Sequence, residues 1–179
     1  MNLYIMRHGK TIWNEQRRTQ GHTNNRLSAY GIKTSNVCAE NLKNVRFDYI
    51  FCSPLCRAVQ TANIINKYHN IKIIKDERLK DIDQGFFTGK YFDKLTKEEL
   101  IAKKNKDKNY NMESCESFYS RIKNFYNFIT TKYSDKTILI VTHSGVACNL
   151  ELIVKKEKFN ETKFNNHTFE NCEIKKFII

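Results

Sequence analysis

The sequence predicts an α/β fold: a three-layer α/β/α sandwich around a mostly parallel sheet, with an antiparallel strand at one edge. Short apolar runs typical of strands alternate along the chain with longer segments that have a single apolar face, as helices do. The run Thr137–Val141 is continuously apolar, which is typical of a strand buried on both faces. No repeat or low-complexity linker divides the 179 residues, so we expect one domain spanning 1–179.

The first part of the chain is expected to alternate strand, helix, strand, helix. Asn2–Met6 is a short apolar run and predicts the first strand. A helix is expected over 28–42, because its first residue is a serine that can act as N-cap. Asp48–Cys52 predicts the second strand. The pair Ser53-Pro54 is typical of an N-cap followed by the first helical residue, and predicts a helix from there to about residue 68.

The rest of the chain continues this alternation with one interruption. The residues 79–90 contain two glycines and show no helical period, so a loop is expected there. We expect the segment at about 86–112 to form a cap over the site described below. The remaining predicted elements are a strand at Ile71–Ile74, a helix over 93–104, a polar break over 105–111, helices over 114–131 and 145–155 around the strand Thr137–Val141, and a last strand at Cys172–Ile179.

Composition and charge narrow the class of protein. The 31 Lys and Arg against 19 Asp and Glu give a net charge of +12, which attracts anionic ligands. The basic residues are scattered, and the sequence shows no helix-turn-helix cue and no clustered basic arm, so we do not expect nucleic acid as a partner. No segment has the length of a membrane span or a secretory signal, which predicts a cytoplasmic protein without a membrane partner. The six cysteines have no zinc-site spacing, so reduced thiols are expected.

Unusual polar residues follow the ends of four predicted strands. Arg7 and His8 end the first, Arg57 lies in the first turn of the helix after the second, Asp81 lies in the loop after the third, and His143 follows the fourth. In a parallel sheet, ligands bind outside the carboxyl ends of the strands. We therefore expect these side chains to converge on one crevice.

This set of side chains suits phosphoryl transfer. Two guanidinium groups beside a helix N-terminus can bind the oxygens of a phosphoryl dianion. A neutral imidazole can attack phosphorus, and a second imidazole can stabilise charge on the oxygens. A carboxylic acid can protonate the leaving oxygen and later deprotonate water. With this much fixed positive charge, no metal ion is needed for electrostatic stabilisation.

Three motifs make the chain similar to a known family. In order and spacing, the motifs resemble the histidine phosphatase superfamily, in its phosphoglycerate mutase-like branch. The similarity covers nearly the whole chain. The motifs are Arg7-His8-Gly9 with Thr11 and Asn14, Ser53-Pro54-Leu55 with Arg57-Ala58 and Gln60-Thr61-Ala62, and Thr142-His143-Ser144-Gly145-Val146.

The resemblance implies roles for these residues. His8 would be the phosphorylated nucleophile, and Arg7, Arg57 and His143 would complete the phosphate pocket. Asp81 would transfer protons, and neither a metal nor another cofactor would be needed. The expected substrate-binding residues are Asn14, as a side-chain donor to the phosphoryl oxygens, Gln20 in the first loop, and Gly21 and Ser144, whose backbone groups would line the site.

Some alternatives stay open at this point. The acid is usually Glu in this family, so either Asp81 or the nearby Asp83 could do its work, with Asp81 favoured by its position in the motif. We expect a phosphomonoester hydrolase for small phosphorylated metabolites. The alternatives are a mutase that returns the phosphoryl group to its substrate, and a phosphate-binding protein that has lost turnover. The hydrolase is favoured because Gln84 stands where the mutases tend to carry Tyr, and because the shielding insertion of the mutases is missing after Gly89.

Overall fold

The computed structural model describes residues 1–157 and 168–179, and its centre is a five-stranded sheet. The strands are β1 (Asn2–Arg7), β2 (Tyr49–Cys52), β3 (Ile73–Lys75), β4 (Thr137–Thr142) and β5 (Ile174–Ile178), in the order β3-β2-β4-β1-β5. The first four run parallel to their neighbours, whereas β5 pairs with β1 antiparallel and forms one edge. The expected mostly parallel sheet with an antiparallel edge strand is confirmed.

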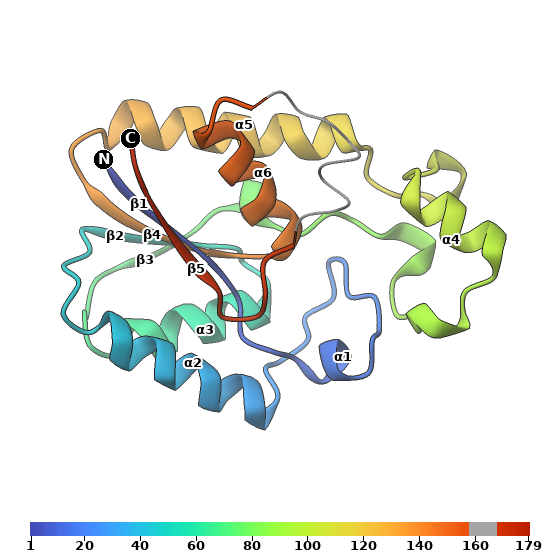
Figure 1. The fold of residues 1–179 in the computed structure, drawn as a ribbon, viewed down its shortest axis with the longest axis horizontal. Helices are drawn as coiled ribbons and strands as arrows, with labels where there is room; N and C mark the ends of the chain where they lie inside the picture. Colours follow the sequence, from blue (N-terminus) through green and yellow to red (C-terminus); the bar gives the residue numbers. More distant parts are fainter. Residues whose placement is uncertain (158–167) are drawn as a thin grey trace.

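Helices cover both faces of this sheet, as Figure 1 shows. On one face lie α2 (Ala29–Leu42) and α3 (Cys56–Asn66), and on the other α5 (Cys115–Lys132) and α6 (Ser144–Val154). Neighbouring residues of β4 face the helices on opposite sides of the sheet. Leu139 packs in the hydrophobic cluster beneath α2 and α3, and Ile140 packs in the cluster beneath α5 and α6. Such alternation follows from the period of two along a strand. The predicted three-layer sandwich is therefore correct.

Local signals explain where most helices begin. Ser28 caps α2 by accepting a hydrogen bond from the N–H of Gly31 at 3.1 Å, and Ser114 caps α5 in the same way. The predicted cap at Ser53 is wrong. The helix α3 begins at Cys56 after the N-cap residue Leu55, which makes no side-chain cap. The reason is that the Ser53 hydroxyl contacts a histidine from another strand, described below.

The segment between β3 and α5 departs most from expectation. The helix predicted over 93–104 is split into a 3₁₀ turn, Phe92–Lys94, and the helix α4, Lys97–Lys104. Thr96 and Glu99 form a capping box that starts α4 afresh. The expected loop holds the 3₁₀ turn Gly85–Phe87 and the polar break holds the turn Lys108–Tyr110, while a third turn, Glu77–Leu79, leads into the loop.

This segment has a small core of its own, built on Phe87, Ala102 and Met112. In Figure 1, α4 lies beyond the carboxyl ends of the parallel strands, on the same side as the short helix α1 (Ile12–Glu15). Both segments therefore lie on the side where ligands of α/β sheets bind. Among residues 1–157 and 168–179, no helix is long and apolar enough to cross a membrane.

Candidate active site

The loop that carries His8 is held from three directions. The His8 amide donates to the carbonyl oxygen of Thr142 on the neighbouring strand, at 2.9 Å. The next amide, of Gly9, donates to the hydroxyl of Thr61 on α3, at 3.0 Å. The helix α2 packs closely on the same loop at Gly31, where an added Cβ would lie 1.9 Å from the Lys10 carbonyl oxygen. As a result, the His8 ring has a fixed position although it belongs to no helix or strand.

Hydrogen bonds define the tautomer of His8. Its Nδ1 lies 2.7 Å from the carbonyl oxygen of Gly9, and because a carbonyl only accepts, Nδ1 carries the proton. The Nε2 atom then carries the lone pair, which accepts a hydrogen bond from the Nε–H of Arg57 at 3.2 Å. Burial, followed by the charges of Arg57 and Arg7, lowers the pKa of His8 well below 6.5. The ring is therefore neutral at pH 7 and can act as a nucleophile through Nε2.

Arg57 is fully buried and connects three segments of the chain. Its two terminal nitrogens donate to the carbonyl oxygens of Thr23, at 2.8 Å, and Gly21, at 2.9 Å. One of them also lies 3.4 Å from Oδ2 of Asp81. Gly21 has φ +51°, a left-handed conformation that a side chain would strain, and this turns its carbonyl toward the guanidinium.

Arg7 and Ser144 meet on the backbone of one residue from the end of the chain. Arg7 Nη1 donates to the carbonyl oxygen of Phe169 at 2.5 Å, and the Phe169 amide donates to Ser144 Oγ at 3.0 Å. The Nε atom of Arg7 is buried and has no hydrogen-bond partner within the described chain. Arg7 therefore keeps an unused donor one residue before His8.

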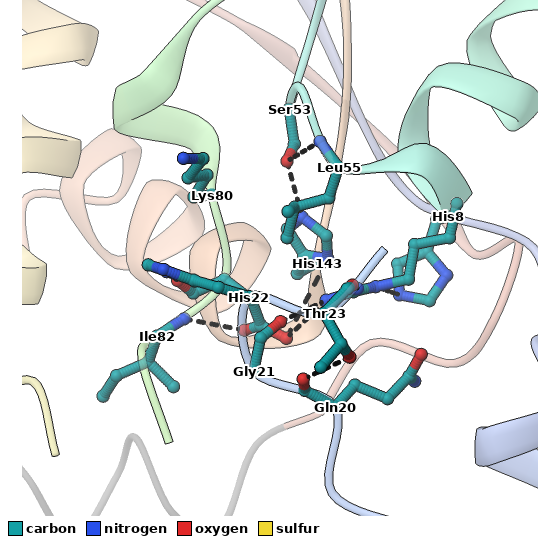
Figure 2. A network of polar contacts seen from close by, with 12 residues as sticks. His8, Gln20, Gly21, His22, Thr23, Ser53, Leu55, Lys80, Ile82 and His143 are labelled. Atoms are coloured by element: carbon teal, nitrogen blue, oxygen red, sulfur yellow. Dashed lines mark hydrogen bonds and ion pairs between the residues drawn. The ribbon is translucent and has the colours of Figure 1, made fainter. Parts of the chain in front are cut away.

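His143 stands beside His8, and Figure 2 shows its ring between Ser53 and the rest of the cluster. The two imidazole centroids are 5.1 Å apart, although the two residues follow different strands, β1 and β4. His143 Nε2 lies 2.8 Å from the hydroxyl oxygen of Ser53, and Nδ1 lies 3.9 Å from Asp81 Oδ2 with no hydrogen bond within the described residues. Burial and the charge of Arg57 lower the pKa of His143 well below 6.5, so this ring is neutral too.

Ser53 is a site residue that the sequence reasoning missed. The Ser53-Pro54 pair predicts a helix cap, but the Ser53 hydroxyl accepts the Leu55 amide at 3.3 Å and contacts His143, as the dashed lines in Figure 2 mark. A usable signal was present, since Ser53 directly follows β2 and therefore lies at the same sheet edge as the other residues.

The loop after β3 is clamped so that one carboxylate faces the cluster. Arg121 forms an ion pair with Glu113 at 2.8 Å and donates to the carbonyl oxygens of Arg78, Lys80 and Asp81. The Asp81 carboxylate then reaches both Arg57 and His143. Asp83 instead accepts from the Gly85 amide at 2.9 Å, and its side chain is 48% exposed. The structure thus places Asp81 in the cluster and Asp83 outside it.

Asn14 and Gln20 lie in the loop after β1, but their carboxamide oxygens are occupied. The Oδ1 atom of Asn14 accepts from the Thr11 amide at 3.1 Å, within the capping box of α1. The Oε1 atom of Gln20 accepts from the Thr11 hydroxyl at 3.0 Å. These bonds orient both amides and leave their NH₂ groups as the part able to donate to an anion.

The cluster as a whole favours an anion. It combines two guanidinium cations and two neutral imidazoles with a single carboxylate, and α6 begins directly after His143 without a side-chain cap. Such a set of buried donors and positive charge suits a phosphoryl dianion. Within the described part of the chain, no group of three His, Cys, Asp or Glu residues has the arrangement of a metal site.

Comparison with known proteins agrees with this geometry. Residues 3–178 match the histidine phosphatase superfamily (branch 1). The chain is 31% identical over 172 residues to the uncharacterized phosphatase PhoE of Bacillus subtilis, across 94% of this chain and 86% of that one. It is 34% identical over 99 residues to the probable phosphoglycerate mutase GpmB of Yersinia pestis, across 55% of this chain and 46% of that one. A mutant phosphoserine phosphatase from Entamoeba histolytica, solved in complex with phosphoserine, matches with TM-score 0.84 and 27% identity, across 99% of this chain and 90% of that one.

Proposed function

Because the chain belongs to branch 1 of the histidine phosphatase superfamily, we propose that it is a metal-independent phosphomonoester hydrolase in which His8 carries the phosphoryl group. The observation that supports this most is the fixed tautomer of His8. Its protonated Nδ1 is bound to the Gly9 carbonyl, and its Nε2 lone pair faces a buried guanidinium. A lone pair next to an anion-binding group is the arrangement that attack on a phosphate ester requires.

The first step transfers the phosphoryl group to the enzyme. Arg7 and Arg57 bind the phosphoryl oxygens, and Asn14, Gln20 and the backbone near Gly21 and Ser144 line the substrate pocket. The Nε2 atom of His8 attacks phosphorus, forming a P–N bond while the ester P–O bond breaks. Asp81, which takes up a proton when the phosphate dianion binds beside it, gives that proton to the leaving oxygen. Nδ1–H of His143 donates to the charge that develops on the phosphoryl group.

The second step releases phosphate. Asp81, now a carboxylate, takes a proton from water as the water oxygen attacks phosphorus. The P–N bond breaks, and His8 regains its neutral Nε2 lone pair. The whole cycle consumes one ester and one water and produces one alcohol and one inorganic phosphate, without an outside cofactor.

We favour a hydrolase over a mutase because of the residues around the acid. Gln84 occupies the place where mutases of this family tend to carry Tyr, and its side chain is bound to Lys103 of the cap. We propose one domain over 1–179 whose segment at about 86–112 caps a pocket open enough to admit water. Small phosphorylated metabolites in the cytoplasm are the proposed substrates, and neither nucleic acid nor a membrane is a proposed partner.

Hydrolysis of p-nitrophenyl phosphate with and without EDTA tests this proposal. We expect turnover that survives chelation and falls at least about a thousandfold in His8→Asn, because the covalent route is lost. The acid-labile phosphohistidine should appear by mass spectrometry in base-quenched wild type and be missing in the variant. His69→Asn is the matched control, because His69 packs on Phe47 away from the cluster.

Three results would contradict the proposal. Turnover that persists in His8→Asn would exclude the nucleophile, and phosphorylation of His8 without release would favour a phosphate-binding protein. Formation of 2-phosphoglycerate from 3-phosphoglycerate faster than inorganic phosphate would favour the mutase.

A further inference from the structure

Lys103 is a partly buried cation of the cap that has no carboxylate partner among the described residues. It lies in the last turn of α4, donates from Nζ to the side-chain oxygen of Gln84, and lies 5.2 Å from the centroid of the Phe87 ring. None of the ion pairs between described residues includes Lys103. Lys90 of the same segment, in contrast, pairs with Glu99 at 2.7 Å.

A short series of contacts leads from Lys103 to the phosphate-binding cluster. Its partner Gln84 follows Asp81 by three residues in the clamped loop. A Cβ placed on Gly21 would lie 3.2 Å from both the backbone nitrogen and the Cβ of Gln84, so the two residues pack directly together. The Gly21 carbonyl in turn accepts from Arg57 at 2.9 Å. The Lys103 ammonium is therefore connected to His8 through three residues in contact, Gln84, Gly21 and Arg57.

The hydrogen-bond partner of Lys103 does not neutralise its positive charge. Burial lowers its pKa to about 8, Lys106 adds to the decrease, and the carboxylate of Asp81 opposes it. A neutral amide satisfies one of three N–H donors but supplies no negative charge. Removing an ammonium from water is costly unless a charged partner compensates it.

We propose that Lys103, together with Gln84, binds a carboxylate on the substrate, so that the enzyme acts on phosphomonoesters that also carry a carboxylate. This inference rests on the proposed function and specifies its substrate class. The Lys103 ammonium and the amide N–H of Gln84 offer two neighbouring donors, which match the two oxygens of a carboxylate. One cation neutralises one carboxylate, whereas a second phosphate dianion would need more positive charge than these two residues offer.

Two pairs of substrates test the proposal because each pair differs in the carboxylate. Phosphoserine is compared with phosphoethanolamine, and 3-phosphoglycerate with glycerol 3-phosphate, by phosphate release. We expect the wild type to prefer the carboxylated member of at least one pair by about 10-fold or more in kcat/KM. In Lys103→Met this preference should disappear, mainly through KM, while the other member of the pair and p-nitrophenyl phosphate keep their rates. Lys104→Met is the matched control, because Lys104 is the exposed neighbour on α4.

The other outcomes separate this inference from the proposed function. No preference in either pair, or a preference that persists in Lys103→Met, overturns the carboxylate site while the hydrolase stands. An equal loss on both members of a pair would make Lys103 an anchor of the cap and overturns it as well. If the wild type hydrolyses none of these esters, including p-nitrophenyl phosphate, the proposed function itself fails and the inference with it.

Discussion

The two buried imidazoles should make the folded protein less stable in mild acid. His8 and His143 are held neutral, with pKa values well below the ordinary 6.5, whereas in the unfolded chain both titrate near that value. Below pH 6.5 the unfolded state therefore binds more protons than the native state, and the equilibrium shifts toward unfolding. The stability contributed by the neutral rings is fully present above pH 6.5 and is lost as the pH falls toward the folded pKa values.

The size of the effect follows from proton linkage. Each fully depressed histidine costs about 1.4 kcal/mol per pH unit below its unfolded pKa. Between pH 7.5 and 5.5, the free energy of unfolding should thus fall by about 1.4 kcal/mol for each ring and about 2.7 kcal/mol for both. Carboxylates with lowered pKa values, such as Glu40 and Glu99, titrate below this window and do not contribute in it.

Urea denaturation at pH 7.5 and 5.5 measures this difference. Phosphate must be left out of the buffer, because a ligand of the native state would add its own stabilisation. His8→Asn and His143→Asn should each reduce the pH-dependent difference by about 1.4 kcal/mol, and the double variant by about 2.7 kcal/mol. His69, whose pKa is lowered by burial, and Cys172, whose pKa is lowered to about 6 by its hydrogen bond with Cys38, add the same slope to every variant. A double variant with the full wild-type slope would refute the neutral state of the two rings.

The remaining predictions concern single side chains. Asp81→Asn should lower kcat by about 100-fold on phosphoserine but far less on p-nitrophenyl phosphate, because the nitrophenolate leaving group needs no proton. Asp83→Asn should keep its activity in the same steady-state assay. Ser53→Ala should lower kcat by about 10-fold, because the Nε2 partner of His143 is gone. ¹⁵N NMR of the imidazoles should then show a changed tautomer population for His143. Gly31→Ala should lower the free energy of unfolding in urea by about 3 kcal/mol, because the new methyl group would collide with a carbonyl oxygen 1.9 Å away.

The sequence predicted the sheet and most of the cluster because both depend on local patterns. The apolar runs placed the parallel strands, and residues that follow such strands must meet at one edge. This is why His8 and His143 could be placed together from their positions alone, and their rings are 5.1 Å apart. The start of α4 also has a local signal, because Thr96 and Glu99 have capping-box spacing, whereas the apolar pattern alone predicts a helix from residue 93.

Ser53 shows what a local pattern cannot decide. A serine before a proline is a good helix start wherever no stronger partner is present. Here the competing partner is His143, 90 residues further along the chain, and the hydroxyl turns to it at 2.8 Å. The N-terminus of α3 is satisfied by another distant residue, because the Cys56 amide donates to the side chain of Asn24 at 3.1 Å. Tertiary contacts of this kind override the preference of a dipeptide.

Buried polar atoms without a hydrogen-bond partner indicate where a ligand is expected to bind, and no sequence motif reveals them. Four buried side-chain nitrogen or oxygen atoms lack a hydrogen-bond partner in the described chain, and two of them are Arg7 Nε and His143 Nδ1. A buried donor without a partner costs about 1 to 3 kcal/mol, so native proteins keep few of them. The surrounding contacts hold both side chains in place, so these atoms cannot turn toward another partner. Ser53 contacts Nε2 of His143, and the Phe169 carbonyl accepts from one terminal nitrogen of Arg7. A bound phosphoryl group would accept from Arg7 Nε, and from His143 Nδ1 when that nitrogen carries the ring proton. Hydrogen bonds that these atoms do not form in the folded protein would then contribute to binding.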